Sequence, residues 1–262
     1  MKQLQSVGSH FMKAGAVVAI VALAGALQAA DTRAGYAKVR YVVGSPMVAK
    51  GGGAQWAPLE KDAILRTGDV IKTDDKSHAD IMLGYNNGSF QLAPGSELAF
   101  DKLQYTLSAF EVVHDTQLNL KSGKIGTAVR KMAPASKYEV KTTKGVAGVR
   151  GTRASIAANG DTTVAEGVVV QSLMMPDNTA KTFTIKKGMT LVAATGQLRD
   201  ATPEEIKWVD QIVADALTHG GYVVDQDPLS RRFFQESQFE PYLPPVSGAE
   251  MPYEPPPSPY RR

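Results

Sequence analysis

Five consecutive residues have the types and spacing of a possible anion-binding or catalytic loop: Gly148, Val149, Arg150, Gly151 and Thr152. Glycines beside an arginine suit a phosphate, but a phosphate-binding loop needs a following helix whose backbone N–H groups point at the anion. Here a strand, an Asn-Gly turn and a second strand follow, and the glycines are not followed by a Lys-Ser or Lys-Thr pair. We therefore expect a structural motif, a bend at which Gly148 and Gly151 relieve crowding. Arg150 would bridge backbone carbonyls or a carboxylate such as Glu166.

No other residues have the spacing of a catalytic or metal-binding motif. The sequence has no cysteine, no Gly-x-Ser-x-Gly and no His-Glu-x-x-His. Its histidines are isolated, at His10, His78, His114 and His219. Several aspartates lie among turn residues, where this side chain bonds its own backbone: Asp69, Asp74, Asp75 and Asp80. We predict no catalytic, cofactor-binding or metal-binding residues and a protein that is not an enzyme, the alternative being a carboxylate pair assembled by folding.

Short alternating segments separated by turns must position the motif. Apolar and polar residues alternate in 37–42, 79–83, 89–92, 138–142 and 183–186, the period of a strand with one face in the core. Asn87-Gly88 and Asn159-Gly160 have the composition of tight hairpin turns. The sequence therefore predicts an all-β domain of many short strands over residues 36–200. A twisted sandwich and a short β-solenoid both fit this pattern.

The composition changes after residue 200. Thr202 is suited to cap a helix whose first residue is Pro203, and an apolar stripe continues to a stop at Gly220-Gly221. We predict one amphipathic helix over 202–219, followed by a linker and tail over 220–262. Eight of the 15 prolines lie between Pro241 and Pro259, so we expect this tail to be extended and disordered, acting as a spacer or as a docking peptide.

The first 30 residues have the features of a secretory signal peptide. Lys2 and Lys13 precede an apolar run, Ala14 to Leu27, which is shorter than a membrane span, and small residues follow it. We therefore expect export to the periplasm or cell envelope and no transmembrane span in the mature chain. The chain has 29 Lys and Arg against 26 Asp and Glu, and two of those lysines lie in this segment. The remainder is nearly neutral, which argues against a nucleic-acid partner.

The order of several short motifs resembles the FecR domain, a periplasmic module named for the ferric citrate regulator. The resemblance covers about residues 39–171 and rests on the following segments: Leu65–Thr73, Ala79–Leu83, Asn87–Ser89, Ser96–Leu98, Gly123–Ile125, Tyr138–Thr142, Val149–Thr152 and Val164–Val170. It implies a non-catalytic, all-β domain, which in its best-known members belongs to an anti-sigma regulator and receives a signal from an outer-membrane receptor. Only 13 residues precede the apolar run, too few for a cytoplasmic sigma-binding domain, so we do not expect anti-sigma activity.

Two hypotheses about function follow. The first is a non-catalytic exported module that binds an envelope protein, in signalling or as a scaffold, through an exposed sheet edge or face. The second is a structural protein that binds the cell wall or a polysaccharide. Sugars stack on exposed aromatic rings, and Trp56, Tyr85 and Tyr105 are candidates for this role, although each also suits the core.

Overall fold

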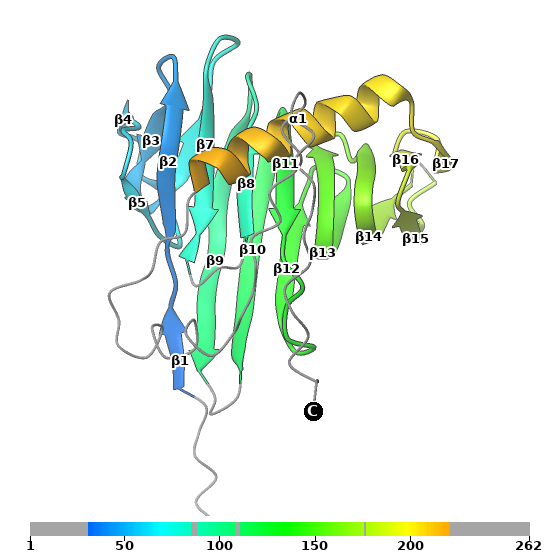
Figure 1. Ribbon diagram of the computed structural model, residues 1–262, viewed down its shortest axis with the longest axis horizontal. Coiled ribbons are helices and arrows are strands. Elements are labelled where there is room, and N and C mark those ends of the chain that lie inside the picture. Colours follow the sequence, from blue (N-terminus) through cyan, green and yellow to red (C-terminus); the bar gives the residue numbers. More distant parts are fainter. Residues whose placement is uncertain (1–30, 85–87, 108–110, 176, 221–262) are drawn as a thin grey trace, which may run out of the picture. The chain divides into compact units, whose positions relative to one another are not determined.

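The computed structural model describes residues 31–84, 88–107, 111–175 and 177–220 (Figure 1). The chain divides into two compact units, Met1–Ala30 and Asp31–Arg262, and every described residue belongs to the second. The predicted signal peptide, the Pro-rich tail and the turn residues Asn86 and Asn87 lie outside the described residues.

The predicted all-β fold followed by one helix is confirmed. In the described part of the chain, strands are joined in one curled sheet. The strands are β1 (Asp31–Ala34), β2 (Ala37–Val43), β3 (Met47–Ala49), β4 (Ala57–Pro58), β5 (Ile64–Leu65), β6 (Val70–Lys72), β7 (His78–Leu83), β8 (Gly88–Leu92), β9 (Glu97–Leu107), β10 (Val112–Ser122), β11 (Lys124–Val129), β12 (Lys137–Lys141), β13 (Gly145–Ala157), β14 (Thr162–Met174), β15 (Ala180–Lys186), β16 (Met189–Val192) and β17 (Gln197–Asp200). A short 3₁₀ turn, η1 (Lys50–Gly52), and the helix α1 (Pro203–Gly220) complete the described elements.

Strand β13 joins two arms of the sheet. Residues 146–148 of β13 pair with β12, and residues 152–157 pair with β11. One arm continues from β11 through β8 and β7 to β2, and the other continues from β12 through β10 and β9 to β6. All ladders among the described strands are antiparallel except β10–β12, whereas the coils of a solenoid pair in parallel. The structure therefore argues against a solenoid and shows a single curled sheet.

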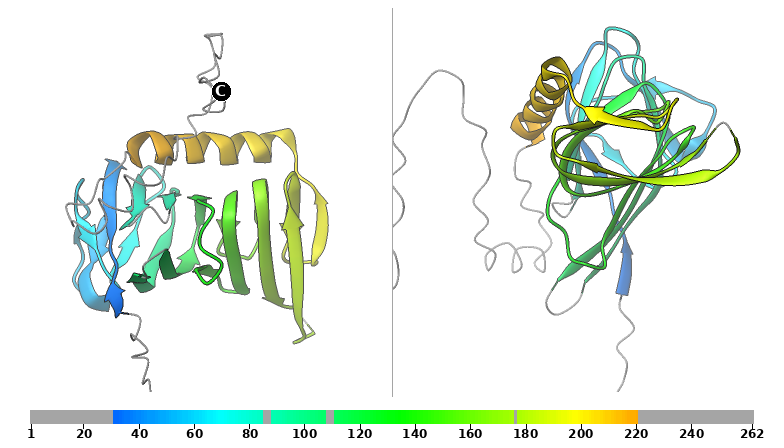
Figure 2. Two further views of the ribbon diagram at one scale, coloured as in Figure 1. Left: turned by 60° about the horizontal axis from the view of Figure 1, so that its bottom comes forward. Right: turned by 90° about the vertical axis from the view of Figure 1, so that its right-hand side faces the viewer.

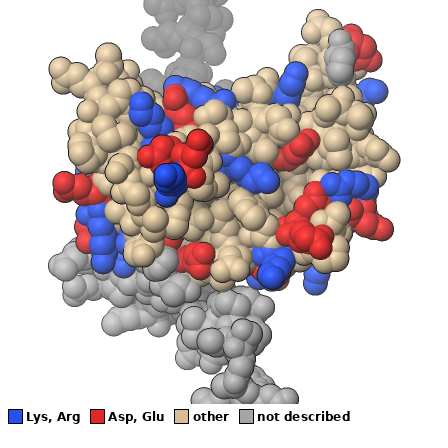
Figure 3. All heavy atoms as spheres, turned by 90° about the horizontal axis from the view of Figure 1, so that it is seen from above, with Lys and Arg blue, Asp and Glu red and all other residues tan. Residues whose placement is uncertain are grey.

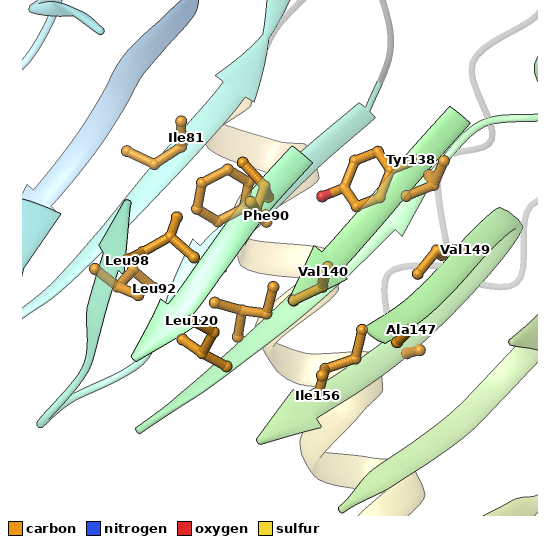
Figure 4. Close-up of a cluster of buried hydrophobic side chains, with 14 of the residues drawn as sticks. Ile81, Phe90, Leu92, Leu98, Leu120, Tyr138, Val140, Ala147, Val149 and Ile156 are labelled. Carbon is orange, nitrogen blue, oxygen red and sulfur yellow. The ribbon is translucent and has the colours of Figure 1, made fainter. Parts of the chain in front are cut away.

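The hydrophobic core fills the space between the two arms (Figure 4). Phe90 on β8 faces Phe100 on β9, with ring centroids 6.3 Å apart. The buried hydroxyl groups of Thr127 on β11 and Tyr138 on β12 lie 3.0 Å apart and connect the arms by a hydrogen bond. Alternation along each strand places these side chains inside, which is the physical reason that the period-two segments predicted strands correctly.

Helix α1 packs across the outer face of β7, β8, β11, β13 and β14 (Figure 2). Its apolar face, with Val209, Ile212 and Val213, lies on small outward residues of the sheet. Gly126 allows the closest approach, because a Cβ there would lie 2.1 Å from the Cγ2 atom of Ile212. The helix therefore covers a part of the sheet that carries glycine, alanine, serine and threonine.

Candidate partner-binding surface

The motif Gly148–Thr152 lies at the corner where β13 passes from one arm to the other. The ladder between β13 and β14 shifts register between Arg150 and Arg153. Gly151 has a φ of +61°, a left-handed conformation that glycine adopts at little cost. The motif is therefore inside a strand, and no helix follows it, so the structure gives no support for a phosphate loop.

Thr152 ties this corner to the neighbouring strand. Its hydroxyl oxygen lies 2.8 Å from the carbonyl oxygen of Val168 and 3.0 Å from that of Arg150. The same oxygen accepts a hydrogen bond from the N–H of Val168 at 3.2 Å. Thr152 is 1% exposed, so these contacts satisfy polar groups that water does not reach.

Strand β14 bends at the same place, at Gly167. Its φ is +84°, and a Cβ there would lie 2.4 Å from the carbonyl oxygen of Gly151. The two glycines thus let two adjacent strands turn together. This matched bend changes the partner of β14 on its other side from β16, at residues 162–164, to β15, at residues 168–174.

The arginines of the corner have separate partners. The Arg150 Nη2 group donates to the carbonyl oxygen of Met132 at 3.4 Å, one of the two kinds of partner that the sequence suggested. A carboxylate oxygen of Glu166 instead lies 2.7 Å from the Nε of Arg153. The Nη1 of the same arginine lies 3.2 Å from a carboxylate oxygen of Asp210 on α1. The carboxylate bridge proposed for Arg150 therefore belongs to Arg153. The sequence alone does not distinguish Arg150 from Arg153 as the partner of Glu166, because the register shift falls between the two arginines.

Beyond the corner, β14 exposes an apolar row. Val168, Val170 and Met174 are 40%, 48% and 51% exposed and alternate with buried residues of the core. The outward neighbour of Val170 on β13 is Gly148, which has no side chain, and its neighbour on β15 is Thr184. Large exposed apolar side chains on one strand are typical of a surface that another molecule covers.

Strand β15 borders this row, and among the ladders of the described strands it takes part in the one with β14. One side of its backbone therefore presents N–H and C=O groups outside any ladder of the described sheet. Exposed lysines lie along and after the strand, at Lys181, Lys186 and Lys187. We define the β14–β15 surface as Val168, Val170 and Met174 with the strand Ala180–Lys186. In the sequence, the alternating apolar residues after Gly167 are the signal for the exposed row on β14. Only the strand pairing shows that β15 lies at an edge of the described sheet.

The aspartates singled out from the sequence have structural contacts. Burial pushes the pKa of Asp69 up, but hydrogen bonds from the Gly51 N–H, the Lys50 ammonium and the Arg66 N–H outweigh it and hold the pKa below its usual value. A carboxylate oxygen of Asp80, which is fully buried, accepts a hydrogen bond from Gln91 at 2.7 Å.

The two histidines whose side chains the structure describes, His78 and His114, have structural surroundings. His114 is buried on β10, and burial lowers the pKa of its imidazole to about 4, so the ring is neutral at ordinary pH. His78 lies beside Tyr41, with ring centroids 6.3 Å apart. Within the described ranges, no group of three His, Asp or Glu side chains has a geometry that would hold a metal ion.

Two of the aromatic residues suggested for sugar stacking have contacts within the protein. Tyr105 is 5% exposed, and the ring of Trp56 carries the Lys72 ammonium 4.0 Å from its centroid. Tyr85 lies outside the described residues.

Charges of both signs are interspersed on the face seen in Figure 3. This mixture agrees with the nearly neutral composition and gives no basic face for a nucleic acid on that side. Among the described residues, the helix does not combine the length and hydropathy that crossing a bilayer requires.

Comparisons with known proteins agree with the sequence resemblance. Residues 69–170 match the family model described as FecR protein. No curated protein matches the chain. Two crystal structures of a candidate anti-sigma factor from Parabacteroides distasonis are similar to it, at 12% and 14% identity with TM-scores of 0.39 and 0.38. The alignments cover 58% and 63% of this chain and 74% and 71% of those chains.

The matched segment begins at the turn that holds Asp69 and ends on β14 within the exposed row, at Val170. It includes the whole corner motif and the segment of β13 that enters both arms. The sequence resemblance begins at about residue 39, whereas the match to the family model begins at residue 69 and so leaves out β2 to β5. Residues 69–170 are therefore the part of this chain that is similar to the FecR family.

Proposed function

We propose that this protein is a non-catalytic, exported module that binds an envelope protein, in signalling or as a scaffold, and that the contact is made at the β14–β15 surface. The observation that carries the proposal is the combination of an unpaired strand edge with the most exposed apolar row of the described residues. The FecR domain supports a regulatory rather than an enzymatic role.

The chemistry of the surface favours addition of a strand. An extended segment beside β15 would continue the sheet through backbone hydrogen bonds, and its side chains would alternate between the two faces. Lys181 and Lys186 favour a segment that carries acidic residues and disfavour a second copy of this lysine-bearing edge. Val170 and Met174 would provide apolar contact on the outer face.

The remaining parts of the chain have supporting roles in this proposal. Residues 1–30 direct export, residues 36–200 form the binding domain, the helix at 202–219 closes its outer face, and residues 220–262 form a linker and Pro-rich tail. The near-neutral charge supports a protein partner rather than nucleic acid.

Site-specific photocrosslinking in living cells tests the proposal. A photoreactive amino acid at Thr182 or Thr184, both exposed on β15, should attach one membrane or envelope protein. The matched control places it at Glu60, which is exposed between β4 and β5 and should give no such product.

The same product should be lost when Met174→Asp, which places a charge in the exposed apolar row, is combined with the photoreactive residue at Thr184. Equal crosslinking at Thr184 and Glu60 would refute the surface assignment. Attachment to wall material alone, together with pelleting on purified wall, would replace the protein partner by the glycan-binding alternative.

A further inference from the structure

A second feature lies at the opposite end of the β13–β14 pair, where the helix begins. A pocket of about 400 Å³ opens between the first turns of α1 and the outer face of β11, β13, β14 and β16. This volume falls within the range of about 300–1,000 Å³ that is usual for small-molecule sites. The pocket involves residues 155–163 of the hairpin and is distinct from the β14–β15 surface.

The floor of the pocket is made of small, hydroxyl-bearing residues. Ser155 and Thr163 are direct neighbours on β13 and β14, and the Thr163 hydroxyl bonds that of Thr190 at 2.9 Å. Ser155 is only 5% exposed and lines the pocket. A hydroxyl at the floor of a pocket is a group that can both donate a hydrogen bond to a ligand and accept one from it.

One wall of the pocket is aromatic. The indole ring of Trp208 lines it from α1, and the Lys124 ammonium lies 4.5 Å from the ring centroid. Trp208 also packs against the apolar cluster beneath the helix, which holds the ring in place. Lys124 is an exposed residue on a flexible stem, so a ligand can displace its ammonium from the ring and accept its hydrogen bonds.

The opposite wall is polar and rigid. The Asn159 amide donates to Asp161 at 2.9 Å, and the Asp161 carboxylate also accepts the N–H of Ala193 at 2.7 Å. These bonds fix the Asn159–Asp161 turn, and the exposed Asn159 amide has a second N–H besides the one that it donates to Asp161. Fixed planar amide and carboxylate groups are suited to hydroxyls, which both donate and accept.

The charges of the pocket exclude an anion. The carboxylates of Asp161, Glu204 and Glu205 line it, against Lys124 and Arg199. Arg199 is already bound by Glu205, with Nη2 to Oε1 at 2.7 Å and Nη1 to Oε2 at 2.8 Å. A phosphate or carboxylate would therefore be repelled by three carboxylates, against which only two cations line the pocket.

We propose that this pocket, defined by Ser155, Asn159, Asp161 and Trp208, binds a neutral saccharide ring. The ring's apolar C–H face lies on the Trp208 indole, and its hydroxyls bond Asn159, Asp161 and the buried Ser155 hydroxyl. An aromatic surface beside fixed polar groups matches a pyranose, which has an apolar face and a rim of hydroxyls. The site stands on different residues from the proposed protein contact and does not depend on it.

Tryptophan fluorescence and saturation-transfer NMR test this site directly, because the chain has only two tryptophans. The probes are N-acetylchitotetraose, cellotetraose and maltotetraose, added to the purified protein carrying Trp56→Phe. At least one of these saccharides should change the fluorescence emission of Trp208. The ring protons of that saccharide should also receive saturation from the protein. Trp208→Leu should weaken its binding about tenfold or more, since a lost aromatic contact of this kind costs about a factor of ten.

Ser155→Val provides a second variant that does not alter the helix. It removes the hydroxyl and fills the floor, so it should weaken binding of the same saccharide while the melting temperature stays close to that of the parent. Thr182→Val, on the β14–β15 surface, is the matched control and should leave saccharide binding unchanged. Absence of saturation transfer from all three probes at millimolar concentration, or equal binding by the parent and Ser155→Val, would overturn the proposal.

Discussion

At the residue scale, two glycines and one threonine determine how the sheet folds over. Gly151 and Gly167 both have positive φ and lie against each other at the corner, and Thr152 bonds across it. Sequence alone identified the β13 side of this corner as a bend. The β14 side was not identified, because Gly167 stands alone between Glu166 and Val168 in an otherwise regular strand pattern.

Substitution of Gly167 by alanine should destabilise the protein by about 2 kcal/mol or more, since it adds both backbone strain and a clash with the Gly151 carbonyl. Urea unfolding measures this loss. Gly188→Ala is the matched control, because Gly188 has a φ of +77° but nothing within 4 Å of its Cβ position. The control should lose only about 1 kcal/mol, the cost of the left-handed conformation alone. Equal losses at both positions would show that the corner contact is unimportant.

His114 should make the stability fall in mild acid. Burial holds its pKa at about 4 in the folded protein, below the value of about 6.5 expected in the unfolded chain. The unfolded chain therefore binds more protons between these values, so stability is constant above pH 6.5 and decreases as the pH falls toward 4, by about 3 kcal/mol.

Urea unfolding at a series of pH values measures this slope, and His114→Gln should remove most of it between pH 6.5 and 5. An unchanged slope in that variant would mean that other groups cause the acid sensitivity.

At the element scale, the start of helix α1 depends on Glu205. Its carboxylate accepts the N–H of Thr202 at 2.8 Å, and the Thr202 hydroxyl accepts the N–H of Glu205 at 3.2 Å, a reciprocal capping box. The Arg199 guanidinium binds both carboxylate oxygens and, with the Thr202 N–H and the Thr190 hydroxyl as further donors, lowers the pKa of Glu205 to about 2. The sequence predicted the Thr202 cap but not the arginine from β17.

Glu205→Gln should therefore lower stability by about 1–2 kcal/mol at pH 7, because it removes the charged acceptor of Arg199 and weakens the cap. A lowered carboxyl pKa stabilises the fold above pH 4.5 and loses this effect as the pH falls toward 2. The difference between parent and variant should shrink over that range. Glu204→Gln, which changes an exposed neighbour, should have little effect at any pH.

At the scale of the whole molecule, the two arms should unfold together. They share β13 and β14 and a single core cluster, and the Thr127–Tyr138 hydrogen bond connects them inside it. A domain held by one core loses its tertiary contacts cooperatively.

Two single-tryptophan proteins report this cooperativity. Trp208→Phe leaves Trp56 beside β4, and Trp56→Phe leaves Trp208 on α1. Their fluorescence midpoints in urea, each compared with far-UV circular dichroism of the same protein, should agree. A fluorescence midpoint of Trp208 well below that of circular dichroism would instead show that the helix undocks before the sheet unfolds.

The sequence by itself determined the all-β class and the helix with its cap. Each follows from a local pattern, which is alternation along one strand for the first and a capping residue before an apolar stripe for the second. Only the tertiary structure decided the pairing of Arg153 with Glu166 and Asp210, the open edge of β15, and the pocket that joins Trp208 to Ser155. These features depend on register and on contacts between segments far apart in the chain, and a shift of one residue in register moves every side chain to the other face of its strand.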